Sequence, residues 1–347
     1  MKKAKIKVGV LGLGRMGLSH AENLLDKIQN AELIALCSLD ETAKNYAKLW
    51  NIPFWYNSYE KMLENQEIDA VIIVSPTPYH PQNILDALRA KKHVFCEKPL
   101  GTNLEEIYNL VKLAKNYQNQ VIQIGFMRRY DKDFHYAKQL VDQNQIGKVF
   151  YIRTLSQDPE KDIKNMFYFG PTSGGQFIDV GAHDLDLMIW YLNSYPKRVW
   201  SLGDAYKYQE FRTWNDGDVV AAMFEFHNGS IGIMTASRIG PQGYQAQAEL
   251  IGTTGHLNIG LIDAKNNVIS LNSAGAVHNY HRNFNSRFKD AYIAELNDFV
   301  DKIIEKNYDK TQLEEALVNI IALKKAQESF QDKQIKEINY PDWLEIK

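Results

Sequence analysis

Short apolar runs alternate with helix-like segments along the first third of the chain. Strand-like runs lie at residues 6–11, 33–37, 69–75, 93–96 and 121–124, and helical patterns separate them at residues 16–28, 41–49, 81–90 and 104–117. The run at 69–75 has apolar residues at consecutive positions, which is typical of a strand buried on both faces. This alternation predicts an α/β domain over residues 1–125, with a doubly wound parallel sheet.

The pattern changes after residue 125. Longer strand-like stretches lie at residues 148–154, 219–226, 230–236 and 247–251, and helical stretches close the chain at 290–304 and 312–329. The pair Asn228-Gly229 predicts a hairpin, because both residues tolerate positive φ, and the run 252–255 predicts a second one. We therefore expect a second, α+β domain over residues 126–347, with a mostly antiparallel open sheet backed by helices.

Composition narrows the class of protein. A length of 347 residues suits two domains, and 40 Lys and Arg against 42 Asp and Glu leave no basic excess for a nucleic-acid partner. No apolar stretch approaches the ~20 residues of a membrane span. The only cysteines, Cys37 and Cys96, are too few for a disulfide framework, so we expect buried thiols and a cytoplasmic protein that binds no membrane.

The glycine motif Gly12-Leu13-Gly14-Arg15-Met16-Gly17 follows the first strand and opens the first helix. In that position Gly12 makes the tight turn, Gly14 lets the backbone approach a pyrophosphate, and Gly17 allows close packing of helix and strand. The helix N-terminus, with Arg15 and Met16, then faces the phosphates. FAD uses the same motif, but no second FAD-type segment is present, so a nicotinamide dinucleotide is expected.

The residue that selects between NAD and NADP is ambiguous. An acidic residue at the end of the second strand usually binds the adenosine ribose. Here Ser38 occupies that position and Asp40 lies two residues further on. Ser38 suits either a ribose hydroxyl or a 2′-phosphate, which Arg15 could neutralise, whereas Asp40 would repel that phosphate. We expect NAD, with NADP as the alternative.

Further candidate residues follow two buried strands. Glu97, Lys98 and Pro99 lie at the carboxyl end of one strand, where α/β sheets bind ligands, and Glu97 offers Lys98 a charge partner. Ser75 and His80 follow the preceding strand and are candidates for cofactor binding. For His80 the alternative is helix capping, and a lysine at a strand end is most often a solvated surface residue.

An Asp–His pair lies at the start of an amphipathic helix. Asp179 and His183 are four residues apart, so their side chains share one helical face. A carboxylate beside an imidazole fixes its tautomer and stabilises the charged ring, which suits a general base. The alternatives are a chance pair on a polar face and a zinc site, for which no third ligand lies at a recognised spacing.

Taken together, these residues resemble the glucose–fructose oxidoreductase/inositol dehydrogenase family (Gfo/Idh/MocA). The glycine motif, Glu97-Lys98-Pro99 and the Asp179–His183 pair occur in the family's order and spacing, and Met127-Arg128-Arg129-Tyr130-Asp131 is similar to bacterial inositol 2-dehydrogenases in particular. The resemblance spans nearly the whole chain. The Glu-Lys-Pro and Met-Arg-Arg-Tyr-Asp motifs are specific, whereas the glycine motif is not.

The resemblance implies a set of roles. Lys98, Asp179 and His183 match the family's catalytic residues for reversible oxidation of a ring hydroxyl, with His183 as general base, Asp179 orienting it and Lys98 binding the reacting oxygen. The Lys98–Pro99 bond is cis in family members. Met127, Arg128 and Tyr244 match positions beside the polyol, and relatives form homotetramers.

The sequence also departs from the best-known family members. A His-x-Asn pair that often faces inositol is replaced here by Ser156 and Asp158, and Val180 stands where some relatives have threonine. We expect an NAD(P)-dependent inositol 2-dehydrogenase acting on myo-inositol or a close isomer. The alternatives are a dehydrogenase for scyllo-inositol, glucose or a deoxy sugar, and a non-catalytic NAD(P)-binding sensor. A glycosidase of related fold has no feature in its favour.

Overall fold

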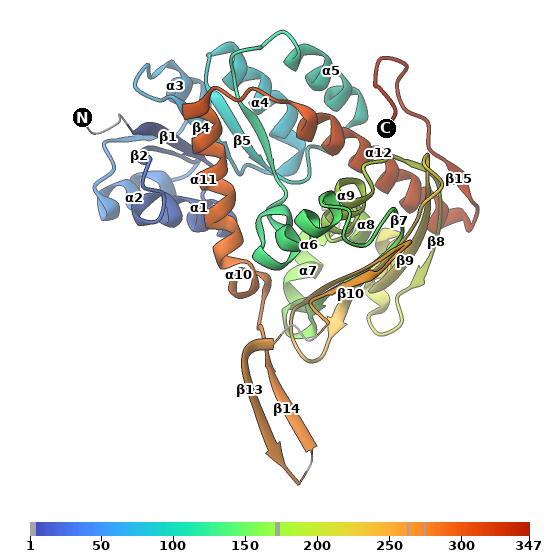
Figure 1. The fold of residues 1–347 in the computed structure, drawn as a ribbon. Coiled ribbons are helices and arrows are strands. Elements are labelled where there is room, and N and C mark those ends of the chain that lie inside the picture. Colours follow the sequence, from blue (N-terminus) through green and yellow to red (C-terminus); the bar gives the residue numbers. More distant parts are fainter. Residues whose placement is uncertain (1–4, 171–173, 262–263, 274) are drawn as a thin grey trace. The chain divides into compact units, whose positions relative to one another are not determined.

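The computed structural model describes residues 5–170, 174–261, 264–273 and 275–347 (Figure 1). The chain forms two compact units, the first comprising residues 1–127 and 292–317 and the second residues 128–291 and 318–347. The expected second domain ran from 126 to 347 without interruption, so the return of 292–317 to the first unit is a difference from that expectation. Within the described part of the chain, no helix is both long and apolar enough to cross a membrane.

The first unit alternates strands and helices. Its strands are β1 (Ile6–Leu11), β2 (Ala31–Cys37), β3 (Phe54–Tyr56), β4 (Ala70–Ile73), β5 (His93–Glu97) and β6 (Ile122–Gly125). Its helices are α1 (Arg15–Asp26), α2 (Thr42–Trp50), α3 (Tyr59–Glu64), the 3₁₀ turn η1 (Thr77–Tyr79), α4 (His80–Arg89) and α5 (Leu104–Ala114). Most of α11 (Lys289–Glu305) and the start of α12 (Thr311–Asp332) also belong to this unit.

The strands of the first unit pair in the order β3-β2-β1-β4-β5-β6, all parallel. The chain order reverses between β1 and β4, and ligands bind such sheets at the carboxyl ends of the strands beside that point. Every residue of β4 is buried, because helices cover both faces of the sheet. The predicted doubly wound fold is confirmed, including the strand that the consecutive apolar run indicated.

Helix α11 explains why residues 292–317 lie in the first unit. Its buried residues Leu296, Phe299 and Val300 belong to the same apolar cluster as Val8 and Val10 of β1. Phe299 also packs edge-on against Phe95 of β5, with 5.9 Å between the ring centroids. Because these side chains complete the core of the parallel sheet, the apolar stripe of this helix packs within the first unit.

The second unit begins with η2 (Met127–Tyr130) and α6 (Lys132–Asp142), and η2 starts on the last residue of the first unit. Its sheet contains β7 (Val149–Pro159), β8 (Pro196–Asp204), β9 (Val219–Phe226), β10 (Ile231–Gly240), β11 (Gln245–Gly252), β12 (His256–Ile259) and β15 (Lys336–Glu337). Between β7 and β9 lie η3 (Glu160–Asp162), α7 (Ile163–Phe169), α8 (Gln176–Asp179), α9 (Gly181–Leu192) and η5 (Gln209–Trp214). A hairpin of β13 (Ala264–Asn272) and β14 (Gly275–Tyr280) precedes α10 (Phe284–Arg287).

The strands of this second sheet pair in the order β12-β11-β7-β10-β9-β8-β15. All these pairs are antiparallel except β7 with β10, which is parallel. The prediction of a mostly antiparallel sheet is confirmed. The parallel pair arises because α8, α9, β8 and β9 intervene between β7 and β10, and a parallel neighbour needs such a long connection.

Alternation along the strands gives this sheet two different faces. On β7, Ile152, Thr154 and Ser156 are buried, whereas Arg153 and Leu155 between them are not. Helix α9 packs on the buried face, against β7 and β10. Since side chains on a strand alternate between faces, Asp158 shares this inner face with Ser156.

The predicted Asn-Gly hairpin connects β9 to β10, but with a different turn from the one expected. Only Gly229 has a positive φ, of 82°, and the Gly229 N–H donates to the Phe226 carbonyl oxygen at 2.9 Å. Asn228 instead accepts the N–H of Ser230 through its side chain. A type I turn followed by a glycine in the left-handed region therefore replaces the turn with two positive φ values.

Candidate active site

The glycine turn after β1 requires glycine at two of its three positions. Gly12 has φ of 89°, and a Cβ there would lie 2.5 Å from the Val74 carbonyl oxygen at the end of β4. A Cβ at Gly17 would lie 1.9 Å from the Gly12 carbonyl oxygen, so α1 could not approach β1 as closely. At Gly14, by contrast, no atom lies within 4 Å of the position a Cβ would take.

This open space at Gly14 is at the N-terminus of α1. Gly14 is the N-cap of the helix, no side chain caps it, and the first turn contains no acidic residue. The backbone N–H groups at the start of a helix lack helical acceptors and carry a partial positive charge. The exposed Arg15 and half-buried Met16 follow directly. The turn therefore fits the pyrophosphate of a dinucleotide, which would bind where the backbone is uncovered.

Ser38 and Asp40 have local roles in the structure. The Ser38 hydroxyl accepts the N–H of Ala43 at 2.8 Å and donates to the Asp40 carbonyl oxygen, which holds the start of α2. The exposed Asp40 carboxylate accepts the Thr42 N–H, and hydrogen bonding from Thr42 lowers the pKa of Asp40. Both residues follow β2, at the edge of the sheet where an adenosine ribose is bound in dinucleotide folds.

Glu97 links the lysine motif to α1. Its side chain is buried, and one carboxylate oxygen, Oε2, accepts the backbone N–H of Lys98 at 3.1 Å. The other, Oε1, lies 2.7 Å from Nε2 of His20, a fully buried histidine of α1. Glu97 is therefore a partner of the Lys98 backbone, and the Lys98–Pro99 peptide is cis, as the resemblance implied.

His80 is buried and joins two backbone segments. Its Nδ1 lies 2.8 Å from the Pro99 carbonyl oxygen and its Nε2 lies 2.7 Å from the Ser75 carbonyl oxygen. Burial lowers the pKa of His80, and the two carbonyl oxygens oppose that shift, because both ring nitrogens can donate a hydrogen bond only when the ring is protonated. His80 thus ties the end of β4 to the Glu97-Lys98-Pro99 turn, and Asn83 fixes the Ser75 hydroxyl at 2.8 Å.

Asp179 and His183 lie on consecutive helical turns of the second unit. Asp179 ends α8, His183 belongs to the first turn of α9, and Val180 between them keeps helical dihedral angles of −88° and −49°. The expected single helix is thus divided at Val180, while the spacing of four residues is preserved. His183 is buried and the Asp179 side chain is one-fifth exposed.

Three residues predicted to lie beside the substrate meet at one buried guanidinium. Arg128, which is 1% exposed, donates through Nη2 to the Ser156 hydroxyl at 2.8 Å and to the Tyr244 hydroxyl at 3.2 Å. Its Nη1 donates to Asp184 Oδ1 at 3.1 Å, and the Ser156 hydroxyl donates to the same oxygen at 2.9 Å. The members of this polar cluster come from η2, β7 and α9, and Tyr244 directly precedes β11. The adjacent Met127 is buried and belongs to the first unit.

Charge in this cluster is nearly balanced. Burial by itself lowers the pKa of Arg128, but Tyr244 and Asp184 raise it overall, so the guanidinium stays charged. Burial raises the pKa of Asp184, and Arg128 and Ser156 oppose that rise. Burial likewise raises the pKa of Tyr244, which keeps its hydroxyl protonated. The cluster offers hydroxyl groups beside a fixed positive charge, an arrangement suited to a neutral polyol.

A second buried arginine holds the remaining acidic candidates. Arg238 of β10 donates through Nη2 to Asp179 Oδ2 at 2.9 Å and through Nη1 to Asp158 Oδ2 at 3.1 Å. The sequence analysis did not identify Arg238, Asp184 or His20 as functional. The sequence does contain a feature that could have indicated Asp184: two arginines in one motif and two aspartates in the other. In the structure Arg128 pairs with Asp184 and Arg129 with Asp186.

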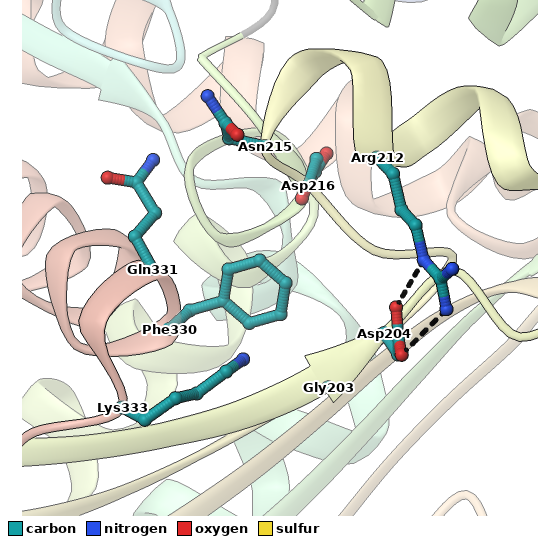
Figure 2. Close-up of a pocket in the computed structure, with 8 residues that line it drawn as sticks. All are labelled: Gly203, Asp204, Arg212, Asn215, Asp216, Phe330, Gln331 and Lys333. Atoms are coloured by element: carbon teal, nitrogen blue, oxygen red, sulfur yellow. Dashed lines mark hydrogen bonds and ion pairs between the residues drawn. The ribbon is translucent and has the colours of Figure 1, made fainter.

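A pocket of about 530 Å³ lies elsewhere in the second unit (Figure 2). Figure 2 shows the Phe330 ring projecting from α12 toward the Asp204–Arg212 ion pair, with Asp216 drawn between Asn215 and Arg212. Asp216 is buried and its Oδ2 accepts the N–H of Gln176, the first residue of α8. None of the residues we predicted lines this pocket. Among the described residues, no group of three or more His, Cys, Asp or Glu could hold a metal ion.

Comparison with known proteins identifies the relatives of the chain. Residues 6–126 match the family described as "Oxidoreductase family, NAD-binding Rossmann fold", and residues 134–258 match the "GFO/IDH/MocA C-terminal domain". The chain is 34% identical over 302 residues to scyllo-inositol 2-dehydrogenase (NAD(+)) of Bacillus subtilis, with 86% of each protein covered. It is 28% identical to myo-inositol 2-dehydrogenase of Thermotoga maritima, covering 86% of this chain and 88% of that protein.

A solved structure is similar over almost the full length. The scyllo-inositol dehydrogenase of Lactobacillus casei, with bound NAD(H) and scyllo-inositol, superposes with a TM-score of 0.93 at 34% identity. The alignment covers 96% of this chain and 99% of that one. With the parallel nucleotide-binding sheet, the open glycine turn and the two domain matches all in agreement, the chain belongs to the Gfo/Idh/MocA family of oxidoreductases.

Proposed function

We propose that this protein is an NAD-dependent inositol 2-dehydrogenase, which oxidises one ring hydroxyl of myo-inositol or a close isomer to a ketone. The observation that carries this proposal is the hydrogen-bonded cluster of Arg128, Ser156, Asp184 and Tyr244, in which hydroxyls and charges meet around a buried guanidinium. A ring with a hydroxyl on every carbon needs many directional donors and acceptors, and such a cluster supplies them. The 34% identical relative is itself named for an inositol.

Each predicted catalytic residue has a chemical task in this proposal. His183 takes the proton of the reacting hydroxyl as general base, a contribution of typically ~10²–10⁴ in rate. Asp179 orients the imidazole and stabilises its charged form. Lys98 hydrogen-bonds the reacting oxygen and stabilises the negative charge that develops on it. Bound NAD supplies the acceptor for the hydride.

We propose that the residues predicted to lie beside the polyol decide the preferred isomer. Ser156 and Asp158 stand where the best-known family members often have a His-x-Asn pair facing inositol, and a serine hydroxyl reaches less far than an imidazole. The Bacillus subtilis relative is named a scyllo-inositol 2-dehydrogenase. Oxidation of scyllo-inositol is therefore the second candidate function, and glucose or a deoxy sugar are further alternatives within the same reaction class.

Cofactor choice rests on the residues after β2. Asp40 lies exposed two positions after Ser38 and carries a low pKa, so it is ionised at neutral pH. A carboxylate near the ribose favours NAD, because it would repel the 2′-phosphate of NADP. The exposed Arg15 would favour NADP. We propose NAD as the working cofactor.

The test is a set of initial rates of NADH and NADPH formation at 340 nm. Substrates are myo-inositol, scyllo-inositol, glucose and xylose, with His183→Ala as the matched inactive control. We expect turnover with an inositol and NAD, and loss of that turnover in the control. Nicotinamide fluorescence measures cofactor binding. If the protein binds the cofactor but oxidises none of the polyols, the proposal is overturned in favour of an NAD(P)-binding sensor.

The outer face of the second sheet supports the predicted homotetramer. Trp200, Leu202, Met223 and Ile231 are each about 40–45% exposed there, from 39% for Trp200 to 45% for Met223. Trp200 and Met223 are direct cross-strand partners. Contiguous exposed apolar groups of this kind mark interaction surfaces, and an open sheet gains most from covering. Light scattering of Trp200→Glu beside the unaltered protein tests this, since a charged patch should dissociate the assembly.

A cytoplasmic location stays a prediction from the two unpaired cysteines.

A further inference from the structure

Arg238 occupies a distinctive place on β10. It lies on the inner face of the second sheet, and its neighbour Ser237 is in register with Gln157, so Arg238 lies beside Asp158. The side chain is only 2% exposed, although a guanidinium is almost never buried without partners. What surrounds it is therefore informative about its role.

Two carboxylates meet this guanidinium, each at one nitrogen. Nη2 donates to Asp179 Oδ2 at 2.9 Å and Nη1 donates to Asp158 Oδ2 at 3.1 Å. Both carboxylates are partly exposed, with 20% of the Asp179 side chain and 27% of the Asp158 side chain accessible. The buried arginine therefore binds two carboxylates that are each partly exposed to solvent.

The planar fork of arginine has consequences that a lysine could not reproduce. Its nitrogens are rigidly spaced, so two carboxylates bound to one fork are held at a fixed separation. Without the intervening positive charge, two neighbouring carboxylates repel, and one of them tends to take up a proton. A protonated Asp179 would no longer stabilise a charged imidazole.

We propose that Arg238 is a positioning residue for the reaction, holding Asp179 ionised and oriented toward His183 and holding Asp158 in place for the substrate hydroxyls. This inference rests on the proposed function, because it assigns Asp179 and Asp158 the roles given there. Only 2% of the Arg238 side chain is exposed, which leaves it almost no surface with which to contact a substrate or a cofactor. It acts through the two carboxylates, one of which serves catalysis and the other the choice of isomer.

The competing explanation is a purely structural arginine. Nη1 also lies 3.2 Å from the Met166 sulfur of α7, so Arg238 could serve only to join β10 to α7. That role predicts a loss of stability with no change in the pH dependence of the reaction. A positioning role predicts a change in that dependence, because the charge next to Asp179 is removed.

The experiment compares Arg238→Gln and Arg238→Lys with the unaltered enzyme, across pH 5 to 10, on scyllo- and myo-inositol. For Arg238→Gln we expect kcat/KM to fall about 10²-fold, the size of effect that misplacing a catalytic group by ~1 Å produces. The acid limb of the profile should move down by about one pH unit, because Asp158, Asp179 and Asp216 then lack their shared counter-ion, and a protonated Asp179 no longer stabilises the charged His183 ring. The ratio of rates on the two isomers should also change, through Asp158.

Arg238→Lys separates charge from geometry. It should return the acid limb to its original pH while leaving kcat reduced, and it serves as the readout if Arg238→Gln does not fold. Arg287→Gln is the matched control, because Arg287 forms a similarly buried ion pair with Asp131 in the same unit. It should lower stability without moving the acid limb.

Two results would overturn the inference, and they are distinguishable. If the unaltered enzyme oxidises inositol but Arg238→Gln keeps both the acid limb and the isomer ratio, Arg238 is structural and the proposed function stands. If the unaltered enzyme oxidises no polyol while binding NAD, the proposed function fails and the positioning role fails with it.

Discussion

The buried His20–Glu97 pair gives a prediction that can be worked from the structure. His20 Nε2 lies 2.7 Å from Glu97 Oε1, and the histidine and carboxylate side chains are 0% and 10% exposed. His20 Nδ1 has no hydrogen-bond partner among the described residues, so the ring proton belongs on Nε2, from which it is donated to the carboxylate. His20→Phe removes that donor while keeping an aromatic ring against Phe95 and Tyr292.

The expected loss in the free energy of unfolding is set by the hydrogen bond that Glu97 loses when His20 is replaced. A hydrogen bond to a charged group contributes about 1.5–3 kcal/mol, and a buried carboxylate left one donor short costs more. Glu97 keeps the Lys98 N–H, so the loss is partial. We expect His20→Phe to lower the free energy of unfolding of the first unit by about 2–4 kcal/mol. Because Glu97 also holds the Lys98 backbone, kcat should fall as well.

The assay is a double-mutant cycle with His20→Phe, Glu97→Gln and both together. Urea unfolding followed by circular dichroism gives the free energies, and hydrogen exchange of peptides from α1 and β5 confines the effect to the first unit. We expect a coupling energy of at least ~1 kcal/mol, because both single variants remove the same contact. Strictly additive effects would refute the reasoning, since they would mean that the short contact contributes nothing.

Three further predictions concern the reaction, the cofactor and pH. His183→Ala should reduce turnover by at least ~10²-fold while NAD affinity, measured by fluorescence titration, stays within about twofold. Ser38→Asp should raise the NAD/NADP ratio of kcat/KM by roughly tenfold or more through repulsion of the 2′-phosphate, while a carboxylate can still accept the Ala43 N–H; an unchanged ratio would show that position 38 does not select the cofactor. Burial raises the pKa of Asp216 to about 6, against the lowering effect of Arg238 and with a further rise from Asp179, so the folded state favours the protonated form. That contribution is complete below about pH 4 and is lost as pH rises through 6, which leaves a cost of about 3 kcal/mol at pH 8. Asp216→Asn should therefore be more stable than the unaltered protein at pH 8 and equal to it at pH 4 in urea titrations, and the same difference at both pH values would contradict this account.

Much of the fold could be predicted from apolar periodicity, and its gaps have physical causes. The consecutive apolar run at 69–75 and the glycine turn after β1 sufficed for the parallel sheet. β3 (Phe54–Tyr56) was not predicted, because a three-residue edge strand has too few positions to establish a period. The pairing of β7 with β10 and the return of α11 to the first unit depend on contacts between distant segments, which no local pattern encodes.

The candidate site was predictable where a motif carried it. Lys98, Asp179, His183 and Arg128 were identified from such motifs. Arg238 was not identified, because a single arginine in a strand is usually a surface residue, and its two carboxylate partners are distant in the sequence. His80 was expected near the cofactor, with helix capping as the alternative; both of its ring nitrogens lie within 2.8 Å of backbone carbonyl oxygens, and its place beside the cofactor stays a prediction.

The discontinuity of the first unit bears on how the protein is made. The ribosome delivers β1 through β6 first, but Leu296, Phe299 and Val300 of the same core are synthesised more than 160 residues after β6 ends at Gly125. The core of the first unit therefore stays incomplete, with apolar surface exposed, until residues 128–291 of the second unit have been synthesised. A fragment ending at residue 127 would keep every glycine of the dinucleotide turn and still lack part of its core. Such a fragment should aggregate, and adding residues 289–317 through a linker should rescue its solubility.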